Sequence, residues 1–541
     1  MTQFDYSKLS VLIADDFSNF RSTVNSMLQS LGVIDVETAG TSQEAIDWCA
    51  RRTFDLILCD YNLGAGRTGQ HVLEELRHHE LISHKTVFII VSAEASRNIV
   101  MSAYDCQPDD YLMKPINTQM LRQRMSRLLA QRQSFSRVYA AMEKGDTTTA
   151  MDVLVDMSLE EDRNALSAQK MLGEVFLQEG FYDNAEKLYS KVLEQRQVDW
   201  ARLGLAKVKQ AKGELEMAGA WLEKIIEENP LYLPAYDSLA QNWEKRGENH
   251  QWQFTVQKAV DISPMSILRQ KKLGEVAQLN NDFSTCVDAL RRTVKLGEHS
   301  CYGQASNHFQ FARVVSLGME RNLDLDAGLA QEALKYLEDA EKWYQLDEAQ
   351  TNQALLLKGR VFAATGESER AAELLTQAAE NMESCEAQLE VHLDQVSVLQ
   401  SLGKREEAQA LLKSLQEMYK GDQDALKKLD AFLDEPASEA NRALVATINR
   451  EGIDFYNKEL FDDALSCFEK ARKLFPKHIG IQLNIVQAYV GKMKNGQQDR
   501  LIANECHACL ELVASLIEEN NPAYGRYLKL REMASATVEF L

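Results

Sequence analysis

Hydrophobic and polar residues alternate in two distinct ways along this chain, and the first pattern covers about the first 130 residues. Five short runs, four of them apolar and one, Val33–Ala39, with interspersed polar residues, are typical of strands in a parallel sheet. Segments with apolar residues at helical spacing lie between them. The runs are Val11–Ala14, Val33–Ala39, Phe54–Asp60, Val87–Val91 and Tyr111–Met113. This alternation predicts an α/β domain with a doubly wound, five-stranded parallel sheet.

The rest of the chain follows a second pattern, which repeats about every 34 residues. Each copy has a turn-type residue, usually a small residue five positions later, and an apolar residue four beyond that. The first five copies are Gly145/Ala150/Leu154, Gly180/Ala185/Tyr189, Gly213/Ala218/Leu222, Gly247/Trp252/Val256 and Asn281/Cys286/Leu290. The period resembles that of the tetratricopeptide repeat, a helix–turn–helix unit. The resemblance implies an all-α solenoid in which stacked units bury one another's apolar faces.

The repeats are less regular in the middle of the chain, and this irregularity suggests domain boundaries. An insertion is expected near residues 295–325, and residues 416–441 interrupt the period, with Pro436 as the best candidate for a break. We therefore predict a first domain at 1–130, a first solenoid part at 131–435 and a second at 436–541, with roughly ten units in all. The second part holds the clearest copy, from Gly452 to Pro476, and ends in a capping helix.

The connection between the two kinds of structure is expected to be stiff. Nothing from Thr118 to Lys144 breaks a helix. The last helix of the first domain should therefore run on, or pass with one bend, into the repeats. A rigid connection can transmit strain between domains, whereas a Gly/Ser-rich linker cannot.

Composition narrows the class of protein. Lys and Arg number 60 against 81 Asp and Glu, a net charge of −21, which argues against a nucleic-acid partner held by phosphate contacts. No long apolar run predicts a membrane span, and the N-terminus lacks a signal-peptide pattern. Nine cysteines without a framework spacing fit a reducing cytoplasm. His78, His79 and His84 are expected on a solvated surface.

Candidate chemistry lies where four of the predicted strands end. The residues at these ends are Asp15 and Asp16, Asp60, Ser92, and Lys114. In open α/β sheets, the carboxyl ends of the strands meet at one edge, where ligands bind. Clustered carboxylates there can hold Mg²⁺, and a lysine can hold a phosphoryl oxygen. The set predicts phosphoryl transfer to a nucleophilic Asp60, giving an aspartyl phosphate.

These residues resemble those of the receiver domain of two-component response regulators, a flavodoxin-like fold. The resemblance rests on Asp15-Asp16, Asp60, Ser92-Ala93 and Lys114-Pro115. It implies that Asp60 accepts phosphate and that Lys114 and Ser92 contact the phosphoryl group. Its implied Mg²⁺ site comprises Asp16, Asp60, the carbonyl of Asn62 and, through water, Asp15. The loop after Asp60 departs from the usual pattern, because it lacks Met-Pro and is slightly long.

The resemblance also implies which residues respond to phosphorylation and which control the hydrolysis of the aspartyl phosphate. Tyr111 and Ser92 would form the switch that reorients on phosphorylation, and Asn62 and Glu94 would tune hydrolysis. The peptide bond before Pro115 is expected to be cis. No enzymatic activity is expected beyond the chain's own phosphorylation and dephosphorylation.

Two functions fit this architecture, and a third is weaker. The first is a cytoplasmic response regulator that receives phosphate from a histidine kinase or phosphotransfer protein and binds a protein partner on the concave surface of its repeats. The second is a scaffold whose receiver serves docking or dimerisation without phosphorylation; a homodimer is possible in either case. Nucleic-acid binding by the solenoid would need a basic stripe, which the net charge disfavours.

Overall fold

The computed structural model describes residues 5–538, apart from 65, 95, 161–162, 322, 324–325, 327, 383–387, 434, 476–477, 496–499, 518 and 520. The chain divides into two compact units, Met1–Tyr344 and Gln345–Leu541. The first unit contains the sheet and the helices up to α17, and the regular elements among the described residues of the second are all helices. The division at 130 and 435 stays a prediction. No helix of the described residues combines the length and apolar composition needed to cross a membrane.

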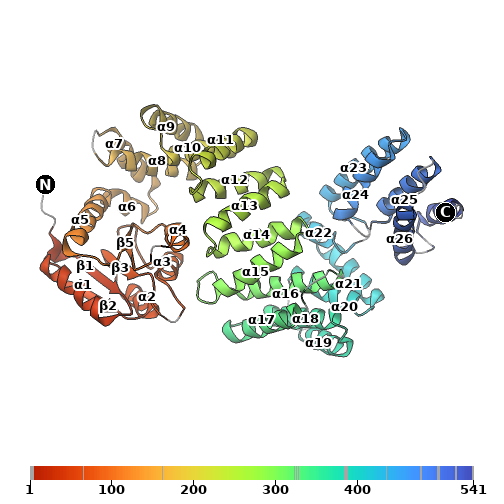
Figure 1. Ribbon diagram of the computed structural model, residues 1–541, viewed down its shortest axis with the longest axis horizontal. Coiled ribbons are helices and arrows are strands. Elements are labelled where there is room, and N and C mark those ends of the chain that lie inside the picture. The colour runs from red at the N-terminus through yellow and green to blue at the C-terminus, as the bar shows by residue number, and fades with distance from the viewer. Residues whose placement is uncertain are drawn as a thin grey trace. The chain divides into compact units, whose positions relative to one another are not determined.

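The N-terminal part of the first unit is an α/β domain (Figure 1). Its elements are η1 (Tyr6–Lys8), β1 (Ser10–Ala14), α1 (Ser18–Ser30), β2 (Asp35–Ala39), α2 (Ser42–Arg51), β3 (Leu56–Asp60), α3 (Gly69–His78), β4 (Val87–Ser92), α4 (Arg97–Asp105), β5 (Asp110–Met113) and α5 (Thr118–Ser134). All strands are parallel, in the order β2-β1-β3-β4-β5. The predicted five-stranded, doubly wound parallel sheet is therefore confirmed.

Helices cover both faces of this sheet, which explains why its central strands are apolar throughout. All five residues of β3 are buried. One face packs on α1 and α5 through Val24, Leu28, Leu121 and Met125. The other face packs on α2, α3 and α4 through Ala45, Ile46, Leu73, Leu76 and Ala103. Burial of each such aliphatic side chain contributes about 1.5–3 kcal/mol to folding.

The second strand starts two residues later than its apolar run predicts. Val33 is buried, but its backbone N–H donates to the carbonyl of Leu28 and closes the end of α1. Ile34 is 78% exposed in the turn. The apolar character of Val33 therefore reflects packing under the helix end, and the strand begins at Asp35.

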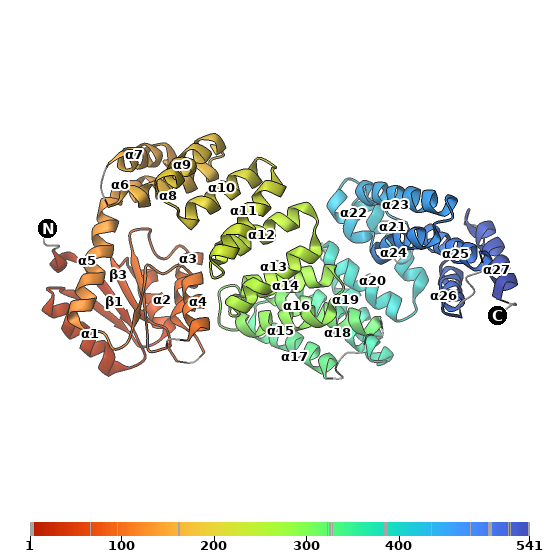
Figure 2. The same ribbon diagram turned by 45° about the horizontal axis from the view of Figure 1, so that its top comes forward.

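The helical part of the first unit follows α5 after a single bend. Phe135 is the C-cap of α5 and the N-cap of α6. Of the two expected connections, a continuous helix or a passage with one bend, the passage with one bend is confirmed. The helices are α6 (Ser136–Met142), α7 (Thr147–Leu159), α8 (Ala165–Gln178), α9 (Tyr182–Gln195), α10 (Asp199–Ala211), α11 (Leu215–Glu228), α12 (Leu233–Arg246), α13 (Asn249–Ile262), α14 (Ile267–Leu279), α15 (Phe283–Gly297), α16 (Ala305–Glu320) and α17 (Leu329–Trp343). Consecutive helices pack on one another along this series (Figure 2).

The second unit continues the same architecture. Its helices are α18 (Glu348–Ala364), α19 (Ser368–Met382), α20 (Leu389–Ser401), α21 (Arg405–Met418), α22 (Gln423–Leu429), α23 (Glu439–Asn457), α24 (Phe461–Leu474), α25 (Ile479–Lys494), α26 (Arg500–Leu516) and α27 (Tyr524–Val538). Among the described residues, the twenty helices from α6 to α26 other than α22 form ten helix–turn–helix pairs. This number agrees with the count expected from the period, and α22 accounts for the interruption at 416–441.

The repeat pattern has a clear backbone cause. The turn-type residues adopt the left-handed conformation, with φ values of +69° at Gly145, +78° at Gly180, +82° at Gly213, +72° at Gly247 and +56° at Asn281. Glycine adopts this conformation without steric cost, and asparagine tolerates it better than most residues. The residue five positions after each turn residue is buried where two helices meet, as for Ala150 and Ala185.

We expect Gly180→Ala to lower the free energy of unfolding by about 1 kcal/mol. An added Cβ would meet no atom within 4 Å, so the cost would come from backbone strain alone. Gly180→Asn should cost less, because asparagine tolerates positive φ. Urea unfolding of both variants checks this, and equal losses would contradict the backbone explanation.

Candidate functional site

The register of the sheet brings the predicted site residues to one edge. Ala14 lies opposite Cys59, so Asp15 and Asp16 follow β1 beside Asp60, the last residue of β3. Asp60 lies opposite Val91, next to Ser92 at the end of β4. Because Ser92 lies opposite Met113, Lys114 follows β5 at the same level. The expected convergence at the carboxyl ends is confirmed.

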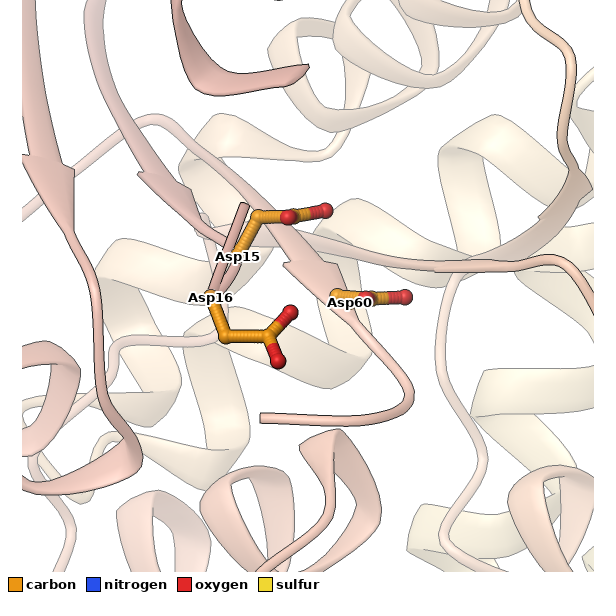
Figure 3. Close-up of side chains that lie close together, drawn as sticks. All are labelled: Asp15, Asp16 and Asp60. Carbon is orange, nitrogen blue, oxygen red and sulfur yellow. The ribbon is translucent and has the colours of Figure 1, made fainter. Parts of the chain in front are cut away.

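Three carboxylates form the centre of this edge (Figure 3). Asp15, Asp16 and Asp60 each offer an oxygen within 4.8 Å of the others. Asp15 and Asp60 are only 1% and 6% exposed, whereas Asp16 faces solvent. The backbone N–H of Phe17 also donates to Asp15 at 2.8 Å. Such a concentration of negative charge requires a compensating cation.

Lys114 provides part of this compensation. Its Nζ lies 2.7 Å from Asp15 Oδ2 and 3.0 Å from Asp60 Oδ2. The same Nζ lies 4.0 Å from the ring centre of Phe20 in α1, a cation–π contact that the sequence did not suggest. Burial opposes the charge of the ammonium, but the hydrogen bonds that Lys114 donates to Asp15 and Asp60 outweigh this effect and raise the pKa of Lys114. The lysine is therefore held charged over Asp60, and the peptide bond to Pro115 is cis as expected.

The electrostatics of Asp60 differ from those of an ordinary carboxylate. Its pKa is raised to about 6, mainly by burial and also by the neighbouring charge of Asp15, against the lowering effect of Lys114. A divalent cation at the three carboxylates would stabilise the ionised form, as bound metals do for nearby acidic groups. The site thus has negative charge in excess of what Lys114 alone balances.

The predicted switch residues are connected through the main chain of Glu94. The backbone N–H of Glu94 donates to Ser92 Oγ at 3.0 Å, and the Tyr111 hydroxyl donates to the carbonyl of Glu94 at 3.0 Å. Asn62 Nδ2 lies 3.5 Å from the carboxylate of Glu94. A shift of the Glu94 segment would therefore change the contacts of Ser92, Tyr111 and Asn62 together.

The loop after Asp60, which departs from the usual receiver pattern, packs tightly against the site. A Cβ at Gly69 would lie 2.3 Å from the backbone oxygen of Asp60, so only glycine fits there. Gly66 has φ +81°, and a Cβ there would lie 2.3 Å from Nε2 of His299, which belongs to the repeats. The loop thus links the acidic cluster to the helical part of the same unit.

Comparison with known families agrees with this geometry. Residues 11–126 match the response regulator receiver domain, and residues 176–242 match the tetratricopeptide repeat. The chain thus joins a response regulator receiver domain to a tetratricopeptide-repeat solenoid.

Several relatives are similar in sequence to the receiver part of this chain. The chemotaxis protein CheY of Pseudomonas aeruginosa is 29% identical over 120 residues, which cover 22% of this chain and 95% of that protein. CheY-3 of Vibrio cholerae is 28% identical, with 22% and 91% covered. The cyclic di-GMP phosphodiesterase response regulator RpfG of Xanthomonas campestris is 30% identical, but only 33% of its length is covered.

Solved structures resemble each part separately. The beryllofluoride-activated receiver domain of DrrB is 23% identical, covers 23% of this chain and 97% of its own, and has a TM-score of 0.20. YrrB, described as a tetratricopeptide-repeat protein with an unusual peptide-binding site, is 19% identical, with 36% and 93% covered and a TM-score of 0.30.

Proposed function

We propose that the protein is a phosphorylation-controlled response regulator that accepts phosphate on Asp60 and acts through protein–protein interaction of its repeats. The observation that carries this proposal is the Lys114 ammonium 3.0 Å from an Asp60 carboxylate that lies within 4.8 Å of two further carboxylates. A structural ion pair would need one carboxylate, whereas phosphoryl transfer needs a nucleophile, a cation site and a phosphoryl contact together.

Asp60 would act as the nucleophile toward a phosphohistidine of a histidine kinase or phosphotransfer protein. One Asp60 carboxylate oxygen bonds to phosphorus, the histidine N–P bond breaks, and the imidazole leaves with its electron pair. Lys114 would then exchange part of its contact with Asp60 for a phosphoryl oxygen, and the hydroxyl of Ser92 would donate to another.

The residues fit Mg²⁺, which takes hard oxygen ligands, few of them from the protein, and keeps several waters. Asp16, Asp60 and the backbone carbonyl of Asn62 would hold it directly, and Asp15 through water. When bound, the cation neutralises charge that builds up on the transferring phosphoryl group. Asp15 already contacts Lys114 at 2.7 Å, which supports its indirect role.

The signal would leave the site through Ser92, Glu94 and Tyr111. Recruitment of the Ser92 hydroxyl by a phosphoryl oxygen competes with the Glu94 N–H contact at 3.0 Å, and Tyr111 is bonded to the same residue. The output would be a changed affinity of the repeats for a protein partner. A homodimer is compatible with this function.

Trifluoroberyllate, a phosphoryl mimic, tests the proposal on the full-length protein. We expect one bound mimic per chain by ¹⁹F NMR in Mg²⁺, none with chelator, and binding at least tenfold weaker in Lys114→Ala, since the mimic loses its cationic contact. Lys85→Ala is the matched control, because Lys85 pairs with Glu143 at 2.9 Å on the surface. Binding that needs no Mg²⁺, or that is unchanged in Lys114→Ala, would contradict the proposed site.

A further inference from the structure

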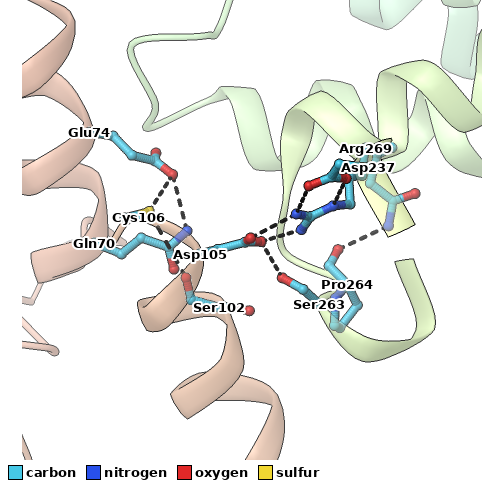
Figure 4. Close-up of polar contacts among 10 residues, drawn as sticks. Gln70, Glu74, Ser102, Asp105, Cys106, Asp237, Ser263, Pro264 and Arg269 are labelled. Atoms are coloured by element: carbon cyan, nitrogen blue, oxygen red, sulfur yellow. Dashed lines mark hydrogen bonds and ion pairs between the residues drawn. The ribbon is translucent and has the colours of Figure 1, made fainter. Parts of the chain in front are cut away.

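Helix α4 of the receiver contacts the repeats of the same unit through a largely buried charge pair (Figure 4). Arg269 of α14 binds both carboxylate oxygens of Asp105: Nη2 lies 2.8 Å from Oδ1, and Nη1 contacts Oδ2. The hydroxyl of Ser263 donates to Oδ2 at 2.7 Å. The Arg269 and Asp105 side chains are 12% and 15% exposed. A bidentate, largely dry pair of this kind is geometrically specific.

The repeats hold this arginine in place by themselves. Asp237 of α12 accepts from Arg269 Nε at 2.8 Å and from Nη2 at 2.7 Å. Ser263 is fully buried at the end of α13. The guanidinium therefore keeps one edge on Asp237 and presents its other edge to the receiver. The site for a carboxylate is built into the solenoid.

An apolar patch lies beside the arginine and receives a second side chain of α4. Met101 packs against the patch formed by Leu233, Tyr236 and Ala259. Met101 and Asp105 are four residues apart, so they lie on the same face of the helix. The repeat surface thus recognises a helix that carries an apolar residue followed, one turn later, by an acidic residue.

An open cleft continues from this contact. It has a volume of about 530 Å³ and is lined by Tyr236, Val256, Ile267 and Lys272 of the repeats, with Glu74 and Arg77 on the receiver side. The recognition surface is therefore larger than the part that α4 occupies. A longer helical ligand has room to extend along it.

We infer that this surface (Ser263, Arg269, Leu233, Tyr236 and Ala259) is the partner-binding site of the repeats, that its ligand is a helical segment with an apolar residue and an acidic residue at i and i+4, and that α4 of the receiver occupies it as an internal competitor. The competitor is displaced when Asp60 is phosphorylated, so this inference rests on the proposed function. Helices that present such spaced anchors to a groove are a common mode of peptide recognition.

A second contact connects the same interface to the phosphorylation site. His299 lies against Gly66 in the loop after Asp60, and the ring of Tyr302 lies 5.5 Å from that of His78 at the end of α3. His78 is exposed, as expected, but it also touches the repeats. Both contacts come from the segment between α15 and α16. Rearrangement of the loop around a phosphoryl group would thus act on the docked receiver.

Hydrogen exchange of the full-length protein tests whether the surface is covered. We expect amides of α4 and of residues 263–270 to exchange at least fivefold faster in Asp105→Asn and in Arg269→Gln, and also in the wild type loaded with Mg²⁺ and trifluoroberyllate. Arg202→Gln is the control, because Arg202 pairs with Glu228 within the repeats. Unchanged exchange in both Asp105→Asn and Arg269→Gln would overturn the inference.

A fluorescent, hydrocarbon-stapled helix of residues 97–106 tests the ligand. By anisotropy, it should bind the trifluoroberyllate-loaded wild type and the unloaded Asp105→Asn chain at least tenfold more tightly than the unloaded wild type. Relative to the unchanged peptide on the trifluoroberyllate-loaded wild type, binding should be at least tenfold weaker for the loaded Arg269→Gln chain. It should also be at least tenfold weaker for a peptide with Asn in place of Asp105. Equal binding by Arg269→Gln would overturn the inference. Failure of the wild type to load the mimic would instead count against the proposed function, and the Asp105→Asn chain would still test the surface.

Discussion

Replacing Asp60 with asparagine will eliminate phosphate uptake and leave the folded protein at least as stable as the wild type. Asparagine has nearly the same shape as aspartate, but its amide cannot form the acyl phosphate. In Mg²⁺ with a small phosphodonor such as acetyl phosphate, the wild type should acquire one acid-stable, alkali-labile phosphate per chain. The variant should acquire none. Phosphate-affinity electrophoresis and intact-mass measurement check this result.

The stability part follows from the charge at the site. Burial raises the pKa of Asp60 from 3.8 to about 6. A carboxyl whose folded pKa is raised contributes stability below pH 4 and loses it as the pH rises through the folded pKa, so its ionised form costs stability at pH 7. Without Mg²⁺, we expect Asp60→Asn to raise the free energy of unfolding by on the order of 1–2 kcal/mol at pH 7.

Urea unfolding in chelator at pH 7 and at pH 5 provides the check. The gain should shrink at the lower pH, because Asp60 of the wild type is then mostly protonated. Asp47→Asn is the matched control, since Asp47 accepts from Gln43 on the surface of α2. A variant that still takes up phosphate, or that loses more than about 1 kcal/mol at pH 7, would contradict the assignment of Asp60.

Substituting Gly204 with alanine will destabilise the repeats by about 2–3 kcal/mol. Tyr189 of α9 is buried, and its ring packs against one glycine of α8 and one of α10. A Cβ at Gly204 would lie 2.4 Å from the Tyr189 ring, and one at Gly173 would lie 2.5 Å from it. Alanine normally favours a helix over glycine by about 1 kcal/mol, so the loss requires that the clash exceed this gain.

The chain offers a control with the opposite sign. Gly219 lies inside α11, and its added Cβ would meet Asn242 Oδ1 at an ordinary 3.5 Å. Gly219→Ala should therefore stabilise by up to about 1 kcal/mol. Tyr189→Leu should rescue much of the loss in Gly204→Ala, because it removes the ring. Urea unfolding followed by tryptophan fluorescence reports on this site, since the ring centres of Trp200 and Tyr189 lie 6.1 Å apart. Equal effects of Gly204→Ala and Gly219→Ala on the free energy of unfolding would refute the packing argument.

Most of the architecture could be predicted from the sequence because its causes are local. The strands are short apolar runs, and the left-handed turn residues recur with the period of the solenoid. The convergence of Asp15, Asp60 and Lys114 also followed from one general property, the common edge of parallel strands. The start of β2 was predicted wrongly, since Val33 is apolar for a packing reason unrelated to strand formation.

The contacts between the receiver and the repeats could not be predicted in this way. Asp105 and Arg269 are 164 positions apart, and neither belongs to a motif or a periodic position with a known role. Arg269 is one charged residue among many until the fold places Asp237 and Ser263 beside it. Phe20, which supports Lys114, reads in the sequence as an ordinary core position of α1. Pairs that depend on tertiary geometry leave no local signal.

The single bend at Phe135 affects how well any other molecule can compete for the partner-binding surface of the repeats. Because α5 passes into α6 without a flexible spacer, α4 is tethered close to Arg269 and presents itself at a high effective concentration, of millimolar order or above for a short tether. A free segment with the same intrinsic affinity, present at micromolar levels, would be excluded almost completely. Its access is therefore governed by how strongly the tethered helix is held, and weakening that hold by about 1.4 kcal/mol raises the occupancy of a weakly competing segment about tenfold.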